Sequence, residues 1–195
     1  MRIVAGTAKG RTIKAPTGYQ VRPTTGRVRE AIFSSLGHRV KGATVLDLFA
    51  GSGALGLEAL SRGAASAFLV EKSRRVLDVL FSNIDVLDMT EQCHIIRGDA
   101  IRALGALKAK GESFDLIFLD PPYETDLLNR AIKLILAERL LTQNGRIIAE
   151  HKRKKEYAFH GIEGLQIVTT KVYGDTQISM LDIVDAQVIS TQQEE

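Results

Sequence analysis

The stretch Asp47-Leu-Phe-Ala-Gly-Ser-Gly-Ala-Leu-Gly56 decides the fold of this chain, because it joins a short apolar run to an amphipathic helix through a turn rich in glycine. Glycines permit a tight turn and let a ligand approach the backbone closely, and the free N–H groups of the next helix point to the same place. Glu71 ends the following apolar run, where a ribose-binding acid belongs. This order of strand, glycine turn, helix, strand and acid predicts a site for a nucleoside-type cofactor.

Around this stretch, apolar runs alternate with amphipathic helical stretches. Expected strands lie at 44–49, 67–71, 94–97, 114–120 and 146–150, and expected helices begin near residues 27, 54, 74, 100 and 127. This alternation predicts a parallel sheet with right-handed crossovers. Two further β-rich runs, 165–173 and 176–184, flank Gly174-Asp175, which is a hairpin signal. The predicted class is therefore α/β: a doubly wound, mostly parallel, Rossmann-like sheet with a C-terminal antiparallel hairpin. This architecture is typical of class I S-adenosylmethionine-dependent methyltransferases.

Composition indicates an ordinary cytoplasmic protein of one domain, with room for a short appendage. The chain has 195 residues, 45% of them hydrophobic and 25% charged. It contains no apolar run long enough for a membrane span and no continuous apolar stretch of signal-peptide type at its start. Its single cysteine excludes an internal disulfide, and its four histidines are scattered, so we expect no metal.

Positive charge is concentrated at the start of the chain. Residues 1–42 hold nine Lys or Arg and one acid, which suggests a polyanionic partner. We therefore expect an N-terminal RNA-binding arm and helix over residues 1–41 and a methyltransferase domain over residues 42–195. The basic residues expected to contact RNA are Arg2, Lys9, Arg11, Arg22, Arg27 and Arg29. A solvated basic tail is the alternative, and the sequence assigns no role to a second cluster at 152–155.

Carboxylates at three strand ends discriminate between two candidate cofactors, NAD and S-adenosylmethionine. Asp47 suits the ammonium of a methionine moiety and would sit badly beside a pyrophosphate. Glu71 can accept hydrogen bonds from both ribose hydroxyls, and Asp99 is placed to accept from the adenine amino group. Three acids fit the positively charged methionine end, which favours S-adenosylmethionine. The expected cofactor-binding residues are Asp47, Ala50, Gly51, Ser52, Gly53, Glu71, Asp99 and Ala100.

The fourth expected strand runs directly into Asp120-Pro121-Pro122-Tyr123, which are the expected catalytic residues. Two prolines fix the backbone and remove two N–H donors, and the expected acceptors are the Pro121 carbonyl and the Asp120 carboxylate. An exocyclic NH2 group needs two such acceptors, because its lone pair must be drawn out of the ring before it can attack a methyl carbon. Tyr123 can stack on the base. A base within a duplex must be flipped out to reach such a pocket.

Taken together, these motifs resemble the bacterial RsmD-type family of guanine-N2 methyltransferases of small-subunit ribosomal RNA. Besides the glycine turn and Asp120–Tyr123, the shared blocks are Arg2-Ile-Val-Ala-Gly6, Lys9-Gly10-Arg11, Arg22-Pro-Thr-Thr, Arg27-Val-Arg-Glu-Ala-Ile-Phe33, Glu58-Ala-Leu-Ser-Arg-Gly-Ala64 and Tyr173-Gly-Asp-Thr176. Gly26 stands where the family often has a polar residue. The resemblance implies that the cofactor binds near Asp47, Gly51–Gly53, Glu71 and Asp99, and that Asp120–Tyr123 receive the guanine. It also implies a substrate in a partly assembled small ribosomal subunit.

Two other functions are weighed against this one. Adenine-N6 methylation of DNA shares the Asp-Pro-Pro-Tyr motif, but the chain has no separate element for reading a groove. A non-catalytic RNA-binding assembly factor with a dead cofactor fold is the second alternative, and the intact motif at Asp120–Tyr123 argues against it.

Overall fold

Seven strands form one sheet in the order β3-β2-β1-β4-β5-β7-β6 in the computed structural model, which describes residues 1–16, 25–122, 126–153, 161–162 and 164–184. The strands are β1 (Thr44–Asp47), β2 (Ser66–Glu71), β3 (Cys93–Arg97), β4 (Phe114–Leu119), β5 (Leu141–Lys152), β6 (Leu165–Tyr173) and β7 (Thr176–Ile183). Strands β1 to β5 pair in parallel, whereas β7 is antiparallel to both β5 and β6. The predicted parallel sheet with a terminal antiparallel hairpin is confirmed.

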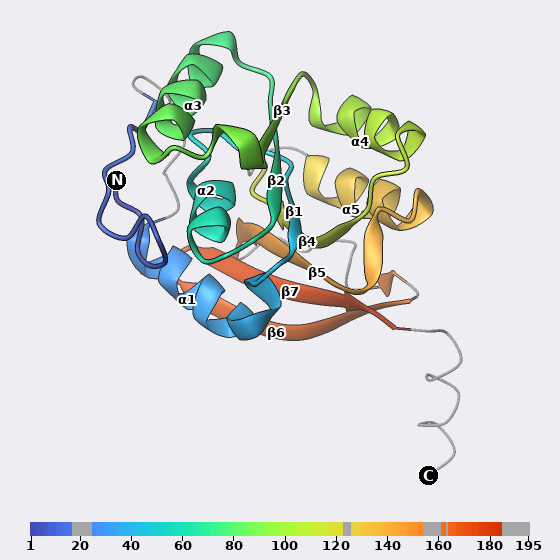
Figure 1. Ribbon diagram of the computed structural model, residues 1–195. Helices are drawn as coiled ribbons and strands as arrows, with labels where there is room; N and C mark the ends of the chain where they lie inside the picture. Colours follow the sequence, from blue (N-terminus) through green and yellow to red (C-terminus); the bar gives the residue numbers. More distant parts are fainter. Residues whose placement is uncertain (17–24, 123–125, 154–160, 163, 185–195) are drawn as a thin grey trace.

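Helices cover both faces of the sheet (Figure 1). They are α1 (Gly26–Leu36), α2 (Ala54–Ser61), α3 (Arg74–Leu87), α4 (Ala100–Ala109) and α5 (Leu127–Ala137), with short 3-10 turns η1 (Gly37–Val40) and η2 (Thr90–Gln92). Buried side chains of α1, α2 and α3 join one hydrophobic cluster, and those of α4 and α5 join the other. The sheet is therefore wound on both faces, as the alternation of strands and helices predicted.

Strand β5 is longer than the sequence suggested. It was expected over 146–150, but it begins at Leu141, which pairs with Phe114 of β4. The intervening residues resemble a turn in composition, yet they run alongside β4, and the Thr142 hydroxyl donates to Asp115 at 3.0 Å. The register shifts between Phe114 and Leu116, so the polar stretch is accommodated by an irregularity in the ladder.

The N-terminal segment Met1–Pro16, called the arm below, packs against the core. Ile3, Ala8 and Ile13 are each 3% exposed or less and belong to the same cluster as buried residues of β1 and α2. Because it has few large apolar residues, the sequence predicts that this segment gains little by packing. That prediction is wrong, since three apolar residues spaced five positions apart anchor the segment to the core. The functional division at residue 41 stays a prediction.

No helix among the described residues is both long and apolar enough to cross a bilayer.

Candidate functional site

A pocket opens where the parallel strands end, because the carboxyl ends of β1, β2, β3 and β4 meet at one edge of the sheet. Nine of the residues predicted for the site line it: Asp47, Ala50, Gly51, Ser52, Glu71, Asp99, Ala100, Asp120 and Pro122. The cofactor-type acids and the Asp-Pro-Pro motif, which lie up to 75 positions apart in the sequence, thus share one cavity.

The glycine loop between β1 and α2 is held by hydrogen bonds to β2. Ala50 donates its N–H to the Val70 carbonyl at 2.9 Å, and Gly51 donates to the Glu71 carboxylate at 3.1 Å. Gly51 and Gly53 both have positive φ, at 55° and 82°, which glycine adopts without strain. Gly53 does not line the pocket, and a Cβ there would approach Leu80 to 2.5 Å. Gly53 therefore lets the loop pack on α3, and its role in cofactor binding stays a prediction.

Asp47 is the most deeply buried acid of the pocket. Only 1% of the residue is exposed, and its carboxylate accepts the N–H of Gly56 at 3.1 Å. Burial raises the pKa of Asp47 to about 7, and the nearby charge of Glu71 pushes in the same direction, against the hydrogen bond from Gly56. A buried carboxyl in this state gains from a cationic partner, because the partner replaces the lost hydration of the ionised form.

Glu71 joins the end of β2 to the glycine loop. One carboxylate oxygen accepts from Gly51 at 3.1 Å, and the other accepts from Ser73 N–H at 2.7 Å. Because each carboxylate oxygen has two lone pairs, both oxygens can accept another hydrogen bond from the pocket side. The two backbone bonds fix the orientation of the carboxylate.

Asp99 has a local structural role in addition to its position in the pocket. It caps α4, and one of its oxygens accepts from Ile101 at 3.0 Å and from Arg102 at 3.2 Å. No residue in the described part of the chain donates to the second oxygen, Oδ2. Asp99 is exposed and lines the pocket, so Oδ2 can accept from a ligand amino group.

The Asp-Pro-Pro motif follows β4 directly. Asp120 is half-buried and lines the pocket, as does the exposed Pro122, whereas Pro121 is buried behind them. Tyr123 lies outside the described residues, so its role stays a prediction. The placement of Asp120 brings a carboxylate acceptor within the same cavity as the three strand-end acids.

Eleven further residues line the pocket that were not predicted for the site, among them Pro16, Ser73 and Leu127. Ser73 follows Glu71 and Leu127 begins α5, so both could have been proposed from their distance to known motif residues. Pro16 comes from the arm, and no local pattern indicates that the arm reaches the cofactor side of the sheet.

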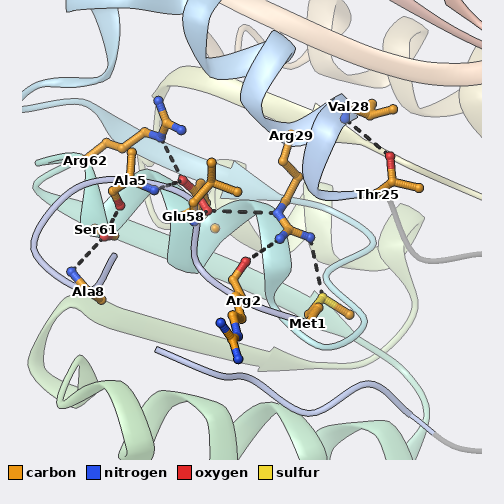
Figure 2. A network of polar contacts seen from close by, with 12 residues as sticks. Met1, Arg2, Ala5, Ala8, Thr25, Val28, Arg29, Glu58, Ser61 and Arg62 are labelled. Carbon is orange, nitrogen blue, oxygen red and sulfur yellow. Dashed lines mark hydrogen bonds and ion pairs between the residues drawn. The ribbon is translucent and has the colours of Figure 1, made fainter. Parts of the chain in front are cut away.

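The prediction that Arg29 contacts RNA is wrong, because this residue is buried. The residue is 1% exposed, and its guanidinium lies 3.9 Å from the Glu58 carboxylate and donates to the Arg2 carbonyl at 2.6 Å (Figure 2). Burial lowers the pKa of Arg29, and the charge of Glu58 opposes that shift. Arg29 therefore ties α1 to the arm and to α2.

Glu58 holds the arm by its backbone. Its side chain is fully buried on α2, and it accepts the N–H groups of Val4 at 2.8 Å and Ala5 at 3.0 Å, along with a side-chain bond from Arg62 at 2.8 Å (Figure 2). Ser61, one turn further, accepts the N–H of Ala8 at 3.0 Å. The block that begins at Glu58 thus contains the residues that bind the arm, a role that the sequence did not indicate.

The other basic residues of the arm and α1 remain at the surface. Arg2, Lys9, Arg11 and Arg27 are exposed, although Arg11 pairs with Asp88 at 3.1 Å and also donates to the Val86 carbonyl. Arg22 lies outside the described residues. Four of the side chains expected to contact RNA are therefore exposed to solvent, whereas the apolar residues that anchor the same region are buried.

The sheet order, the antiparallel last pair and a pocket at the strand ends define the class I S-adenosylmethionine-dependent methyltransferase fold. Among the described residues, no group of His, Cys, Asp and Glu could hold a metal ion.

Comparison with known proteins identifies the family. The chain belongs to the family described as Conserved hypothetical protein 95 (Cons_hypoth95), whose model matches residues 1–182. It is 39% identical over 180 residues to YlbH of Bacillus subtilis (strain 168). The aligned residues cover 92% of this chain and 97% of that protein. It is 41% identical over 135 residues to Ribosomal RNA small subunit methyltransferase D of Escherichia coli (strain K12), covering 69% of this chain and 66% of that one. The solved structure of yhhF from Escherichia coli matches with a TM-score of 0.82 and 34% identity, over 94% of this chain and 97% of that chain.

Proposed function

We propose that this protein transfers a methyl group from S-adenosylmethionine to the exocyclic N2 amine of a guanine in small-subunit ribosomal RNA. One observation carries the proposal: Asp120 shares a single pocket with Asp47, Glu71 and Asp99. The acceptor for an amine and the acids for a nucleoside cofactor are therefore contiguous. The similarity to a ribosomal RNA small subunit methyltransferase supports the choice of substrate. Since ribosomal RNA is the substrate, the protein acts in the cytoplasm.

The strand-end acids fit S-adenosylmethionine better than a dinucleotide. Asp47 pairs with the ammonium of the methionine moiety, Glu71 accepts from the two ribose hydroxyls, and Oδ2 of Asp99 accepts from the adenine amine. The backbone at Gly51 and Ser52 allows close approach of the ligand. A pyrophosphate would face three carboxylates in the same pocket, which is electrostatically unfavourable.

The chain's own task in the reaction is to aim the amine. Bound S-adenosylmethionine supplies a methyl group activated by a sulfonium centre. Asp120 and the Pro121 carbonyl accept the two amine hydrogens, so the nitrogen lone pair is drawn out of conjugation and directed at the methyl carbon. The nitrogen gains the methyl group, the carbon–sulfur bond breaks, and the amine proton passes to Asp120 and then to solvent. Tyr123 stacks on the face of the base.

The exposed cations of the arm and α1 bind the RNA backbone. Arg2, Lys9, Arg11 and Arg27 neutralise phosphates, as does Arg22, and the substrate is a small subunit that is partly assembled. Such contacts release counterions, so affinity for RNA falls steeply as the salt concentration rises.

The test is to identify the methylated nucleoside. The protein is incubated with methyl-labelled S-adenosylmethionine and, separately, unmethylated small-subunit ribosomal RNA, assembling small subunits and duplex DNA, and each product is digested to nucleosides. We expect N2-methylguanosine from RNA or from the particle, with Asp120→Ala as the inactive control. N6-methyladenine from DNA would support the DNA enzyme instead. No methyl transfer to any substrate, by protein that binds RNA, would support a non-catalytic assembly factor.

A further inference from the structure

Asn83 of α3 joins the arm to the glycine loop. The residue is 1% exposed, and its amide nitrogen donates to the Ser52 carbonyl at 2.9 Å and to the Lys14 carbonyl at 3.0 Å. Its amide oxygen accepts the N–H of Lys14 at 2.8 Å. One buried side chain therefore satisfies backbone groups of two segments that lie far apart in the sequence, and both amide hydrogens are used.

Both segments held by Asn83 reach the cofactor pocket. Ser52 lines it directly, and Pro16, two residues after Lys14, lines it from the arm. On the opposite side of the loop, Gly51 is fixed by Glu71. The glycine loop is thus held from two directions, by Glu71 of β2 and by Asn83 of α3, and Asn83 also holds the arm.

The same part of the arm carries charge on its outer side. The Lys14 side chain is exposed, with its ammonium donating to Ser82 at 3.2 Å, and the exposed Arg11 lies three residues earlier. A polyanion that binds these cations stabilises the conformation in which the Lys14 backbone is clamped by Asn83. A cofactor in the pocket stabilises the same conformation through Ser52 and Pro16.

We propose that Asn83 is a positioning residue for methyl transfer, which couples nucleic acid on the arm to cofactor in the pocket, so that each tightens the binding of the other. This inference rests on the proposed function, because it requires the arm to bind RNA. Coupling between sites is reciprocal, and the same factor must appear in both affinities.

The experiment measures affinity for S-adenosylhomocysteine by calorimetry, with and without saturating unmethylated small-subunit ribosomal RNA, in the full chain. In the wild type we expect RNA to tighten cofactor binding by about fivefold or more, the lower end of usual coupling. In Asn83→Ala the ratio of the affinity with RNA to the affinity without RNA should fall to about one. Ser61→Ala is the matched control, because it removes another buried tether of the arm but does not touch the loop. It should keep the wild-type ratio.

Asn83→Asp provides a second variant where Asn83→Ala fails to fold, since it keeps the shape and the acceptor for Lys14 N–H while its ionised form lacks the donors to Ser52. Circular dichroism verifies the fold of each variant. An equal ratio in the wild type and a folded Asn83 variant would overturn the inference, as would a wild-type ratio of one with RNA bound. Absence of RNA binding to the wild type, measured by fluorescence anisotropy, would overturn the proposed function as well.

Discussion

The pocket edge and the arm both carry charged residues, but they use them in opposite ways. At the pocket edge, Asp47 and Glu71 end their strands, Asp99 follows β3, and all three line a cavity. In the arm and α1, Arg27 is exposed while Arg29, two positions on, is buried against Glu58. A strand end places a side chain at a predictable site, whereas a high local charge does not say which cation faces solvent. The contrast teaches that position in the topology is the stronger evidence.

Replacing the buried Arg29 should lower the stability of the protein much more than replacing the exposed Arg27. Arg29→Met should lower the free energy of unfolding by about 1–3 kcal/mol, because it leaves the Arg2 carbonyl without its buried donor and removes one of the two cations beside Glu58, where Arg62 remains. Arg27→Met, the matched exposed variant, should change it by less than about 0.5 kcal/mol. Urea unfolding followed by circular dichroism measures both. Equal stabilities of the two variants would remove the distinction between the buried and the exposed arginine.

Asp120→Ala should lower the methyl-transfer rate by about 10²–10³-fold, the usual loss when a preorganised polar contact to the reacting group is removed. Its affinity for S-adenosylhomocysteine should stay close to that of the wild type, because the carboxylate addresses the amine. Single-turnover transfer and calorimetry separate the two effects. Asp126→Ala, an exposed acid shortly after the motif, is the control and should be active. Wild-type turnover in Asp120→Ala would exclude the amine-aiming role.

Glu71→Ala should weaken cofactor binding by about 1–3 kcal/mol, because two ribose hydroxyls lose their acceptors and Gly51 loses its anchor. Asp78→Ala, an exposed acid on α3, should bind like the wild type. Calorimetry with S-adenosylhomocysteine gives both values. An unchanged affinity in folded Glu71→Ala would remove this acid from the cofactor site.

The pH dependence of cofactor binding should report on Asp47. Its pKa is raised to about 7, and only the ionised carboxylate pairs with an ammonium, so affinity should rise with pH through this range. If the loss of one proton from Asp47 controls binding, the affinity for the cofactor should rise roughly eightfold between about pH 6 and pH 7.5. This window lies below the usual pKa of an α-amino group, about 7.7–8.0. Asp47→Asn should bind more weakly and lose this dependence. The same slope in Asp47→Asn would assign it to another group.

Much of the fold and of the pocket could be predicted from sequence, because periodicity sets strands and helices and topology brings strand ends together. The bounds of β6 were predicted to the residue, and α3 begins at the expected residue 74. The start of β5 was missed, because the polar residues at 142–145 form an irregular stretch between Leu141 and Arg146, the two residues that pair with β4 on either side of it. The packing of the arm was missed because Ile3, Ala8 and Ile13 follow no helical or strand period. The clamp by Asn83 depends on three segments meeting in space, which no local pattern encodes.

Amide hydrogen exchange in the ligand-free protein tests most directly whether the arm is part of the core. The N–H groups of Ile3, Val4, Thr7, Ala8 and Lys14 each donate to a defined acceptor, at distances of 2.7–3.0 Å. We expect these amides to exchange slowly, with protection comparable to that of the amides of α2, because the arm opens only with the elements to which it is bonded. Exchange at the rate of an unstructured peptide, with α2 still protected, would show that the arm is a solvated tail.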